Sequence, residues 1–197
     1  MRLLITGTSS GFGKFLHDQY SIDHEVISIN RPEFDLKDSK FLESINDTID
    51  YDIVIINAAT RSNRENDDWS TVFNVNFSNQ VALVEKIKDR IKSKLIFMSS
   101  RSSSMQNLKI RPLDRFEYNT LAYKASKAAL NVAMLHYHKK LDIPVVALTP
   151  GHISDLIQHP QSVVPKKVTN PTVEFINSIT ETHSGKLFNY DGSERPL

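Results

Sequence analysis

A tyrosine and a lysine four residues apart are the side chains of this sequence best suited to acid–base chemistry. Tyr123 and Lys127 stand in the segment YKASKAALN, whose small and apolar residues indicate a helix. A spacing of four places both side chains on one helical face, one turn apart. A phenol has an unperturbed pKa of about 10, and a neighbouring ammonium favours its ionised form. The pair is therefore a candidate for proton transfer, although many helices carry such a pair only as surface residues.

A glycine-rich turn near the N-terminus has the arrangement of a phosphate-binding loop. It reads TGTSSGFG over residues 6–13, after the apolar run at residues 3–5 and before a helical pattern. Gly7 allows a tight turn, Gly11 lets the backbone approach a pyrophosphate, and Gly13 permits close packing of helix on strand. The first amides of the helix would then face the phosphates. A purely structural turn is the alternative, and the position between strand and helix favours dinucleotide binding.

The end of the second apolar run bears on the choice of nicotinamide cofactor. Asn30 and Arg31 follow residues 26–29, and neither is acidic. At this point of a dinucleotide-binding fold an acidic side chain binds the ribose 2′-hydroxyl of NAD, whereas an arginine accommodates the 2′-phosphate of NADP. Arg31 therefore favours NADP(H) over NAD(H). The alternative is that Arg31 is a solvated surface charge.

Short apolar runs alternate with helical patterns along the whole chain. Five continuously apolar runs are expected to be strands buried on both faces of a parallel sheet, at residues 3–5, 26–29, 53–56, 95–98 and 145–148. Helical patterns occupy residues 13–20, 69–91 and 123–140. Asn170 and Pro171 predict the cap and first turn of another helix, and a last strand is expected at residues 186–189. The alternation predicts an α/β fold, a doubly wound parallel sheet with helices on both faces, in a single domain over residues 1–197.

The composition argues against several classes of function. The 197-residue chain has 24 Lys and Arg against 23 Asp and Glu residues, and no basic block indicates a nucleic-acid partner. It has no cysteine, which excludes disulfides and thiolate metal sites and fits a reducing compartment. His136 and His138 fall on different faces of the expected helix, so no metal site is predicted. Neither a secretory signal nor a membrane-spanning segment is apparent, so a soluble cytoplasmic protein is expected.

Several further motifs occur in a recognisable order. These are NAA at Asn57-Ala58-Ala59, FNVN ending at Asn76, FMSS ending at Ser100, YKASKAALN from Tyr123, and TPG ending at Gly151. Together with TGTSSGFG they make nearly the whole chain resemble the short-chain dehydrogenase/reductase family, whose fold is of the Rossmann type. MSSRSSS, YKASKAALN and SGKLFNYDGSE resemble the small carbonyl-reductase or C-factor-like subgroup.

The resemblance implies catalytic roles for four residues. Tyr123 would exchange a proton with the substrate oxygen, and Ser100 would hold and polarise that oxygen. Lys127 would bind the nicotinamide ribose and favour ionisation of the tyrosine. Asn76, at a kink in its helix, would position a water that relays protons to Lys127. Four other serines crowd the loop of Ser100, so each is an alternative; Ser100 is preferred because it is the second serine of the SS pair at the strand end.

The resemblance also implies a cofactor surface. Asn57, Ala58 and Ala59 would line the adenosine side, the pair at residues 35–36 would flank the adenine, and the pair at residues 150–151 would close over the nicotinamide. The full set of residues predicted to bind the cofactor is Gly7, Ser9, Ser10, Gly11, Phe12, Gly13, Asn30, Arg31, Asp35, Leu36, Asn57, Ala58, Ala59, Tyr123, Lys127, Pro150, Gly151 and Ile153.

The sequence departs from the family pattern in three places. Only three residues separate Arg31 from Asp35, so the helix usual between the second and third strands is expected to be missing, which weakens the argument from Arg31. The loop between Ser100 and Tyr123 is long and basic, and is either a lid or partner surface or a flexible insertion. Asp155 stands where a cofactor-contacting threonine is common.

The leading prediction is an NADP(H)-dependent oxidoreductase that interconverts a carbonyl and an alcohol on a small molecule. One alternative is a sugar-nucleotide reductase of the extended branch of the family, since the missing helix and the string INAAT resemble deoxysugar reductases. A second is a regulatory or signalling protein that binds the cofactor with little turnover. The resemblance further implies a homodimer or homotetramer that pairs the Asn76 and Tyr123 helices. Apolar residues on more than one face of these helices support it, namely Val81, Leu83, Val84, Met134, Leu135 and Tyr137.

Overall fold

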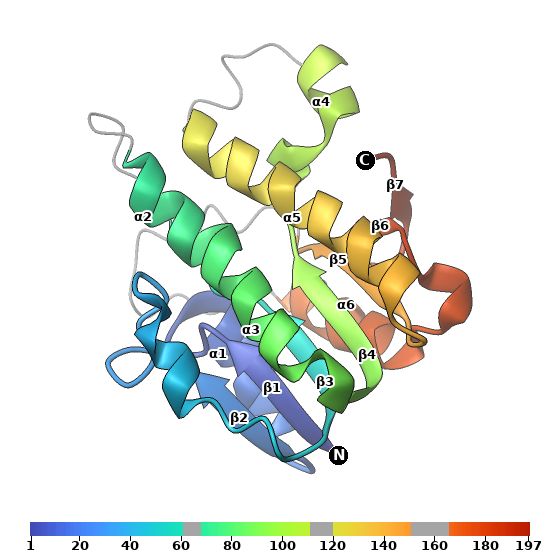
Figure 1. The fold of residues 1–197 in the computed structure, drawn as a ribbon. Coiled ribbons are helices and arrows are strands. Elements are labelled where there is room, and N and C mark those ends of the chain that lie inside the picture. The colour runs from blue at the N-terminus through green and yellow to red at the C-terminus, as the bar shows by residue number, and fades with distance from the viewer. Residues whose placement is uncertain (61–67, 111–119, 151–165) are drawn as a thin grey trace.

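A computed structural model describes residues 1–60, 68–110, 120–150 and 166–197. In this part of the chain one sheet has the strand order β2-β1-β3-β4-β5-β6-β7 (Figure 1). All neighbours pair in parallel except β6 and β7, which are antiparallel. The strands are β1 (Arg2–Thr6), β2 (Glu25–Ile29), β3 (Tyr51–Ile56), β4 (Ile91–Met98), β5 (Val145–Thr149), β6 (Leu187–Asn189) and β7 (Glu194–Arg195).

Helices cover both faces of this sheet. The α-helices are α1 (Gly11–Tyr20), α2 (Trp69–Phe73), α3 (Asn79–Ile87), α4 (Met105–Ile110), α5 (Leu121–Lys140) and α6 (Lys166–Ser178). A π-helical turn, η2 (Asn74–Ser78), joins α2 to α3, and 3-10 turns occur at η1 (Ser39–Ser44), η3 (Lys88–Arg90), η4 (Arg101–Ser103) and η7 (Glu181–His183). In Figure 1, α3 and α5 lie in front of the sheet and α1 and α6 behind it. The predicted doubly wound α/β fold is confirmed.

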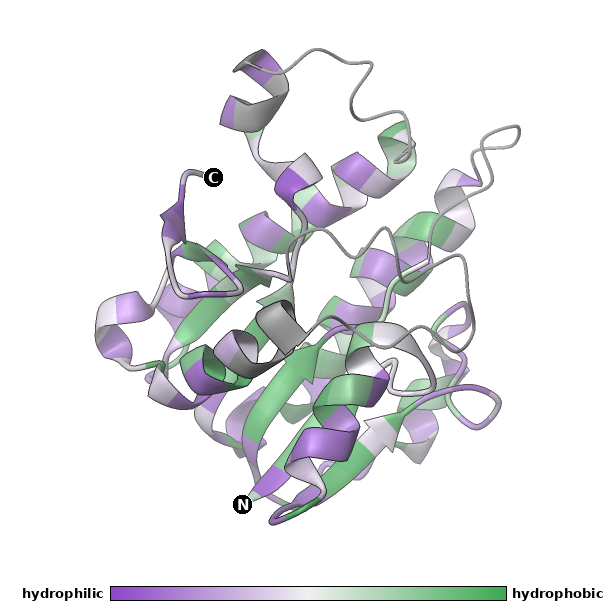
Figure 2. Cartoon of the chain, turned by 180° about the vertical axis from the view of Figure 1, so that it is seen from behind, coloured by the Kyte–Doolittle hydropathy of each residue, from purple (hydrophilic) through white to green (hydrophobic). Residues whose placement is uncertain are grey.

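Two apolar cores explain why the strands are apolar without alternation. On one face Leu4, Val54 and Phe97 pack with residues of α3 and α5. On the other face Leu3 and Ile55, with further strand residues, pack with residues of α1 and α6. Successive strand residues therefore enter opposite cores, as a sheet covered on both sides requires. Figure 2 shows the apolar strands enclosed between helices whose outer surfaces are polar.

The strand order has a topological switch point between β1 and β3. After β1 the chain continues to the sheet edge at β2, whereas after β3 it continues in the opposite direction to β4. The loops that leave β1 and β3 therefore diverge at the carboxyl ends of these neighbouring strands. In open α/β sheets this switch point is where ligands bind. The glycine-rich turn and the NAA segment are the two loops concerned.

The second strand is an edge strand because the unit that usually follows it is missing. The common dinucleotide-binding order continues from strand 2 to a further strand 3 outside it. Residues 30–50 contain the 3-10 turn η1 and no strand or α-helix. The predicted loss of the helix is confirmed, and the strand that it would serve is absent from these residues as well.

Some elements differ from the sequence prediction. The prediction that Asn170 and Pro171 begin a helix is wrong: α6 begins at Lys166 and contains Pro171. Proline fixes a helical φ and removes one N–H, so a turn of helix can precede it at the expense of one hydrogen bond. The expected helix over residues 69–91 is divided by the π turn and ends before β4. Strand β7 was not predicted because two residues carry no periodic pattern.

Candidate active site

The glycine-rich turn has the backbone that the sequence predicts. Gly7 has φ +74°, and a Cβ placed there would lie 2.7 Å from the Ala58 Cα atom. A Cβ on Gly13 would collide with the Gly7 carbonyl and the Asn57 amide, so Gly13 allows α1 to pack against the turn. Gly11 has φ +56° and would meet nothing within 4 Å. Two glycines therefore serve packing, while Gly11 leaves its backbone open to a ligand.

The N-terminus of α1 fits the phosphates of a dinucleotide. Ser10 is the N-cap residue, its side chain makes no capping hydrogen bond, and no acidic residue lies in the first turn. The first amides of the helix and the positive end of its dipole thus favour an anion at this position. Ser9, Ser10 and Gly11 are exposed there. Phe12 was also predicted to contact the cofactor. Its side chain is buried in the core, so only its backbone can face a ligand.

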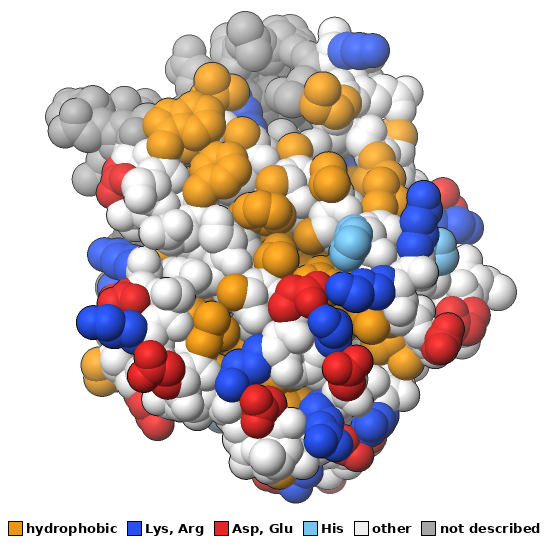
Figure 3. Space-filling model, viewed as in Figure 1, with side chains coloured by type: hydrophobic (Ala, Val, Ile, Leu, Met, Phe, Trp, Pro, Cys, Tyr) orange, Lys and Arg blue, Asp and Glu red, His pale blue; other side chains and the backbone are white. Residues whose placement is uncertain are grey.

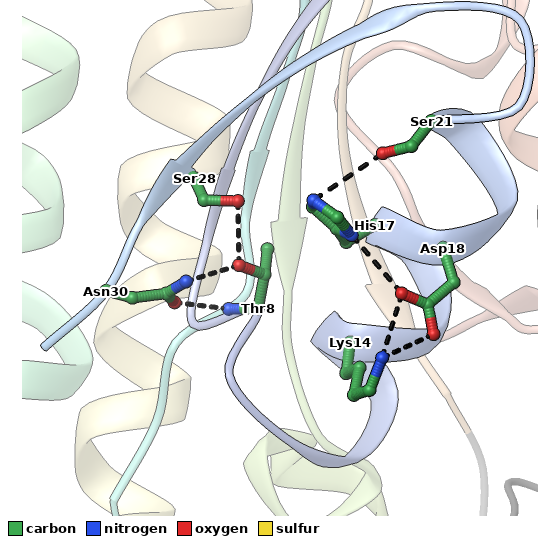
Figure 4. A network of polar contacts seen from close by, with 7 residues as sticks. All are labelled: Thr8, Lys14, His17, Asp18, Ser21, Ser28 and Asn30. Atoms are coloured by element: carbon green, nitrogen blue, oxygen red, sulfur yellow. Dashed lines mark hydrogen bonds and ion pairs between the residues drawn. The ribbon is translucent and has the colours of Figure 1, made fainter.

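Asn30 holds the turn through its carboxamide. Its Oδ1 accepts a hydrogen bond from the Thr8 amide, and its Nδ2 donates to Thr8 Oγ1, which in turn donates to Ser28 Oγ over 2.9 Å (Figure 4). A separate network on the outer face of α1 includes the ion pair of Lys14 and Asp18 at 2.7 Å. Asn30, predicted as a cofactor contact, is therefore a residue that fixes the shape of the turn.

Arg31 lies at the surface beside this turn. Its side chain is exposed and makes no ion pair or hydrogen bond with any residue that the structure describes. The neighbouring loop is anchored by its backbone, since Phe34 N donates to Asn30 O over 2.8 Å. Among the described residues nothing competes with an anionic ligand for this guanidinium.

Thr6 and Asn57 join the loops that follow β1 and β3. The Thr6 hydroxyl accepts from the amides of Asn57 and Ala58 at 2.8 and 2.9 Å. The Asn57 side chain donates to the carbonyls of Thr6 and Gly7 at 3.0 and 3.2 Å. Ala59 is exposed beyond them. The segment at residues 57–59 therefore lies directly beside the phosphate turn.

Tyr123 and Lys127 are buried on α5, one turn apart. Their relative exposures are 7% and 2%. Thr120 caps the helix by accepting from Tyr123 N at 3.3 Å, which places the tyrosine in the first turn. Lys127 Nζ donates to the Met98 carbonyl over 2.8 Å, at the last residue of β4. The two side chains are therefore buried at the carboxyl edge of the sheet and are not surface residues.

Asn76 reaches the same helix from the π turn. Its Nδ2 donates to Ser126 Oγ and to the Thr60 carbonyl, both over 3.0 Å, and its Oδ1 accepts from Thr60 N at 2.7 Å. Ser126 lies between the tyrosine and the lysine in sequence and donates to the Tyr123 carbonyl over 2.9 Å. The predicted helix irregularity at Asn76 is the π turn, a feature often found at functional sites.

Ser100 occupies the turn directly after β4. It is the N-cap of η4, and its hydroxyl accepts from Ser102 N at 3.2 Å. Its side chain is half-buried, whereas the four neighbouring serines at residues 99 and 102–104 are buried. Ser100 is therefore the most accessible serine of the group, which agrees with its choice over the others.

Two of the buried serines, Ser99 and Ser103, belong to a network that sequence reasoning missed. Asn131 on α5 accepts from Ser99 Oγ at 2.6 Å and donates to Ser103 Oγ over 3.0 Å. Ser103 Oγ donates to the Ser100 carbonyl over 2.6 Å. The network fixes the backbone of Ser100 from behind. Its signal in the sequence is a polar residue on the buried face of the α5 helix.

A second missed residue is Gln80, which is fully buried in α3. Its Oε1 accepts from Thr6 Oγ1 at 3.0 Å, and its Nε2 donates to the carbonyls of Ala58 and Val75 at 2.8 and 3.2 Å. It therefore links β1, the NAA loop and the π turn. Of the remaining predicted positions, Pro150 is half-buried after β5. Gly151, Ile153 and Asp155 lie outside the described residues.

Most of the chain matches the model of a known protein family. Residues 3–193 match the family described as the NAD dependent epimerase/dehydratase family. The chain belongs to this family. With the fold, this match confirms the predicted class of enzyme, a short-chain dehydrogenase/reductase. A comparison with curated proteins found no match.

Several solved structures with the same fold are carbonyl reductases, at low sequence identity. The putative carbonyl reductase Sniffer of Caenorhabditis elegans superposes with a TM-score of 0.76 at 18% identity, over 100% of this chain and 98% of its own. NADPH bound carbonyl reductase from chicken fatty liver gives 0.77 at 17%, over 100% and 98%. A carbonyl reductase from Pseudomonas aeruginosa PAO1 gives 0.74 at 18%, over 100% and 99%.

Among the residues that the structure describes, no helix is long and apolar enough to cross a membrane. These residues also contain no group of three or more His, Asp or Glu side chains placed to hold a metal ion.

Proposed function

We propose that this member of the epimerase/dehydratase family is an NADP(H)-dependent oxidoreductase that interconverts a carbonyl and an alcohol on a small molecule. The observation that carries the proposal is the arrangement around α5. Buried Tyr123 is linked through Ser126 to Asn76. Buried Lys127 donates to the carbonyl of Met98, the last residue of β4, and Ser100 lies in the turn that follows this strand. The four side chains come from three elements that meet at the carboxyl edge of the sheet.

In the direction of reduction the Tyr123 hydroxyl donates a proton to the substrate oxygen, and the Ser100 hydroxyl donates a hydrogen bond to that oxygen. A bound nicotinamide would supply the hydride. Lys127 holds the ribose and stabilises the tyrosinate left after proton transfer. Asn76 positions a water beside Lys127 for reprotonation. In oxidation the same groups act in reverse.

We propose the reduced and oxidised forms of NADP as the preferred cofactor. Exposed Arg31 stands beyond the end of β2, with no ion-pair partner among the residues that the structure describes. An arginine at this position suits a 2′-phosphate. The chicken enzyme of the same fold is NADPH bound, which agrees with this choice.

A sugar-nucleotide reductase is the second candidate, and the family match favours it. The family is described by epimerase and dehydratase activities, and the edge strand β2 lacks the unit that usually follows it. The two candidates differ in substrate and share the catalytic residues.

A substrate panel tests the proposal. The protein is incubated with NADPH or NADH and with simple aldehydes, ketones and nucleotide-linked keto sugars, and cofactor oxidation is followed at 340 nm, the absorbance of the reduced nicotinamide. We expect turnover with NADPH on simple carbonyls. Turnover confined to nucleotide-linked sugars supports the second candidate. Tight cofactor binding without turnover on any carbonyl would contradict both and leave a regulatory protein.

A further inference from the structure

The loop after β2 lacks its usual scaffold and is held instead by side-chain amides. Within residues 30–50 neither a strand nor an α-helix supports this loop. A short stretch at the π turn and the start of α3, residues 74–80, approaches it. We call this stretch the amide segment; its amide side chains are those of Asn74, Asn76, Asn79 and Gln80.

Asn79 makes the buried one of the two contacts with this loop. Its Nδ2 donates to the Leu36 carbonyl over 2.9 Å, and both residues are buried, with exposures of 8% and 6%. Asn74 donates to the next carbonyl, that of Lys37, over 3.3 Å at the surface. A buried carbonyl that loses its donor bears a desolvation cost that a surface carbonyl recovers from water. The Asn79 bond therefore fixes the loop, and the Asn74 bond adds little.

The residue after Asn79 holds the opposite side of the same pocket. Gln80 donates to the Ala58 carbonyl over 2.8 Å, in the segment that we assign to the adenosine side. Two successive side chains of α3 thus fix the backbone of residues 35–36 and of residues 57–59. These are the two loops between which an adenine would lie.

We propose that Asn79 is a positioning residue for the adenine subsite. Its amide sets the backbone of the Asp35-Leu36 turn, and so the spacing between this turn and the NAA loop. The inference rests on the proposed nicotinamide cofactor. The Asn79 side chain makes no hydrogen bond with Tyr123, Lys127 or Ser100, so its effect falls on binding of the adenylate half and not on the chemical step.

The test divides the cofactor into its two halves. The full chain and its variants are titrated by calorimetry with NADPH, with 2′,5′-ADP or AMP as the adenylate half, and with reduced nicotinamide mononucleotide. The variants are Asn79→Leu, which removes the donor, and Asn79→Asp, which replaces it by an acceptor of the same shape. Asn74→Ala is the matched control, since it removes the surface bond to the same loop. Circular dichroism checks that each variant is folded.

We expect both Asn79 variants to weaken NADPH and the adenylate half by about tenfold. The mononucleotide affinity should stay within about twofold, and so should every affinity of Asn74→Ala. With a substrate in hand, KM for NADPH rises while kcat at saturation is unchanged.

Two results would overturn the inference. One is a folded Asn79 variant with native affinity for the adenylate half; the other is an equal loss for both halves, which indicates general damage to the fold. If Asn79→Leu does not fold, Asn79→Asp carries the test. A native protein that binds neither NADPH, NADH nor the adenylate half contradicts the proposed function itself.

Discussion

Asn30, Asn57 and Asn76 each bind the backbone of a neighbouring loop through their carboxamides. Asn30 holds Thr8, Asn57 holds the two carbonyls at the end of β1 and just after it, and Asn76 holds Thr60. These residues shape the candidate site and leave other groups of the loops open to solvent. Exposed Arg31 is such a group.

Replacement of Arg31 by Ala should remove the preference for NADPH over NADH. A charge-assisted hydrogen bond contributes about 1.5–3 kcal/mol, so NADPH affinity should fall by about 10- to 100-fold while NADH affinity changes little. Fluorescence titration of the native protein and the variant with each cofactor measures both affinities. Lys37→Ala, which removes another exposed cation from the same loop, is the control. An unchanged preference in the Arg31 variant would show that Arg31 is only a surface charge.

At the residue scale the sequence predicts what local spacing determines. Tyr123 and Lys127 are four residues apart on one helix, and the three glycines lie within one turn, so their geometry follows from short stretches of chain. Gln80 and Asn131 are different, because their partners Thr6 and Ser99 are 74 and 32 residues away. Such pairings depend on how the elements pack, which a single sequence does not specify.

Among the elements, α6 is joined to the sheet by a buried cation. Lys94 on β4 donates through Nζ to the carbonyls of Ile176, Asn177 and Ile179 at 3.1, 3.1 and 3.2 Å. A cation at a helix C-terminus satisfies carbonyls that lack partners within the helix and interacts favourably with the dipole. Burial lowers the pKa of Lys94 below its ordinary value, while the three carbonyls bind its protons.

Lys94→Met should therefore destabilise the protein by about 1–3 kcal/mol, since it leaves buried carbonyls without a donor. For a chain of this size that corresponds to a fall in Tm of roughly 2–4 °C per kcal/mol. Thermal unfolding followed by circular dichroism measures it. Lys92→Met on the same strand, which removes an exposed ion pair with Asp50, should change stability by less than about 1 kcal/mol. Equal effects of the two substitutions would argue against the anchoring role.

The helices and strands were predictable from the sequence where their apolar pattern extends over many residues. The continuous apolar strands and α5 follow from buried periodicity, whereas the start of α6 before Pro171 and the two-residue β7 do not. The missing helix was predictable because only three residues separate Arg31 from Asp35, too few for a helix. The amide contacts that support the loop in place of this helix were not predictable from the sequence.

At the scale of the whole molecule, an apolar surface extends over α2, α3 and α5 (Figure 3). It is smaller than the sequence indicates, because Leu83, Val84, Met134 and Tyr137 are core residues. Val81 and Leu135 remain half-buried at its base. Exposed large apolar residues of these helices are Trp69 at 44%, Leu121 at 67% and Val132 at 67%.

We propose that this surface pairs two subunits, in a homodimer or within a homotetramer. Burial of apolar side chains favours association, so light scattering at micromolar concentration should give twice or four times the monomer mass. Val132→Glu should shift the mass toward that of a monomer. Ile22→Glu, at an exposed apolar residue outside these helices, should not. A monomer mass for the native chain would contradict the proposal.

The central claim, that Tyr123 transfers the proton, is tested most directly by Tyr123→Phe on a substrate that the native protein reduces. The variant keeps the buried ring and removes one oxygen. Loss of general acid–base catalysis typically lowers the rate by about 10²–10⁴-fold, so kcat should fall by at least about a hundredfold while cofactor affinity is unchanged. Lys127→Ala should instead weaken both, because that side chain is assigned to the ribose and to the tyrosine. Near-normal turnover by folded Tyr123→Phe would contradict the catalytic assignment.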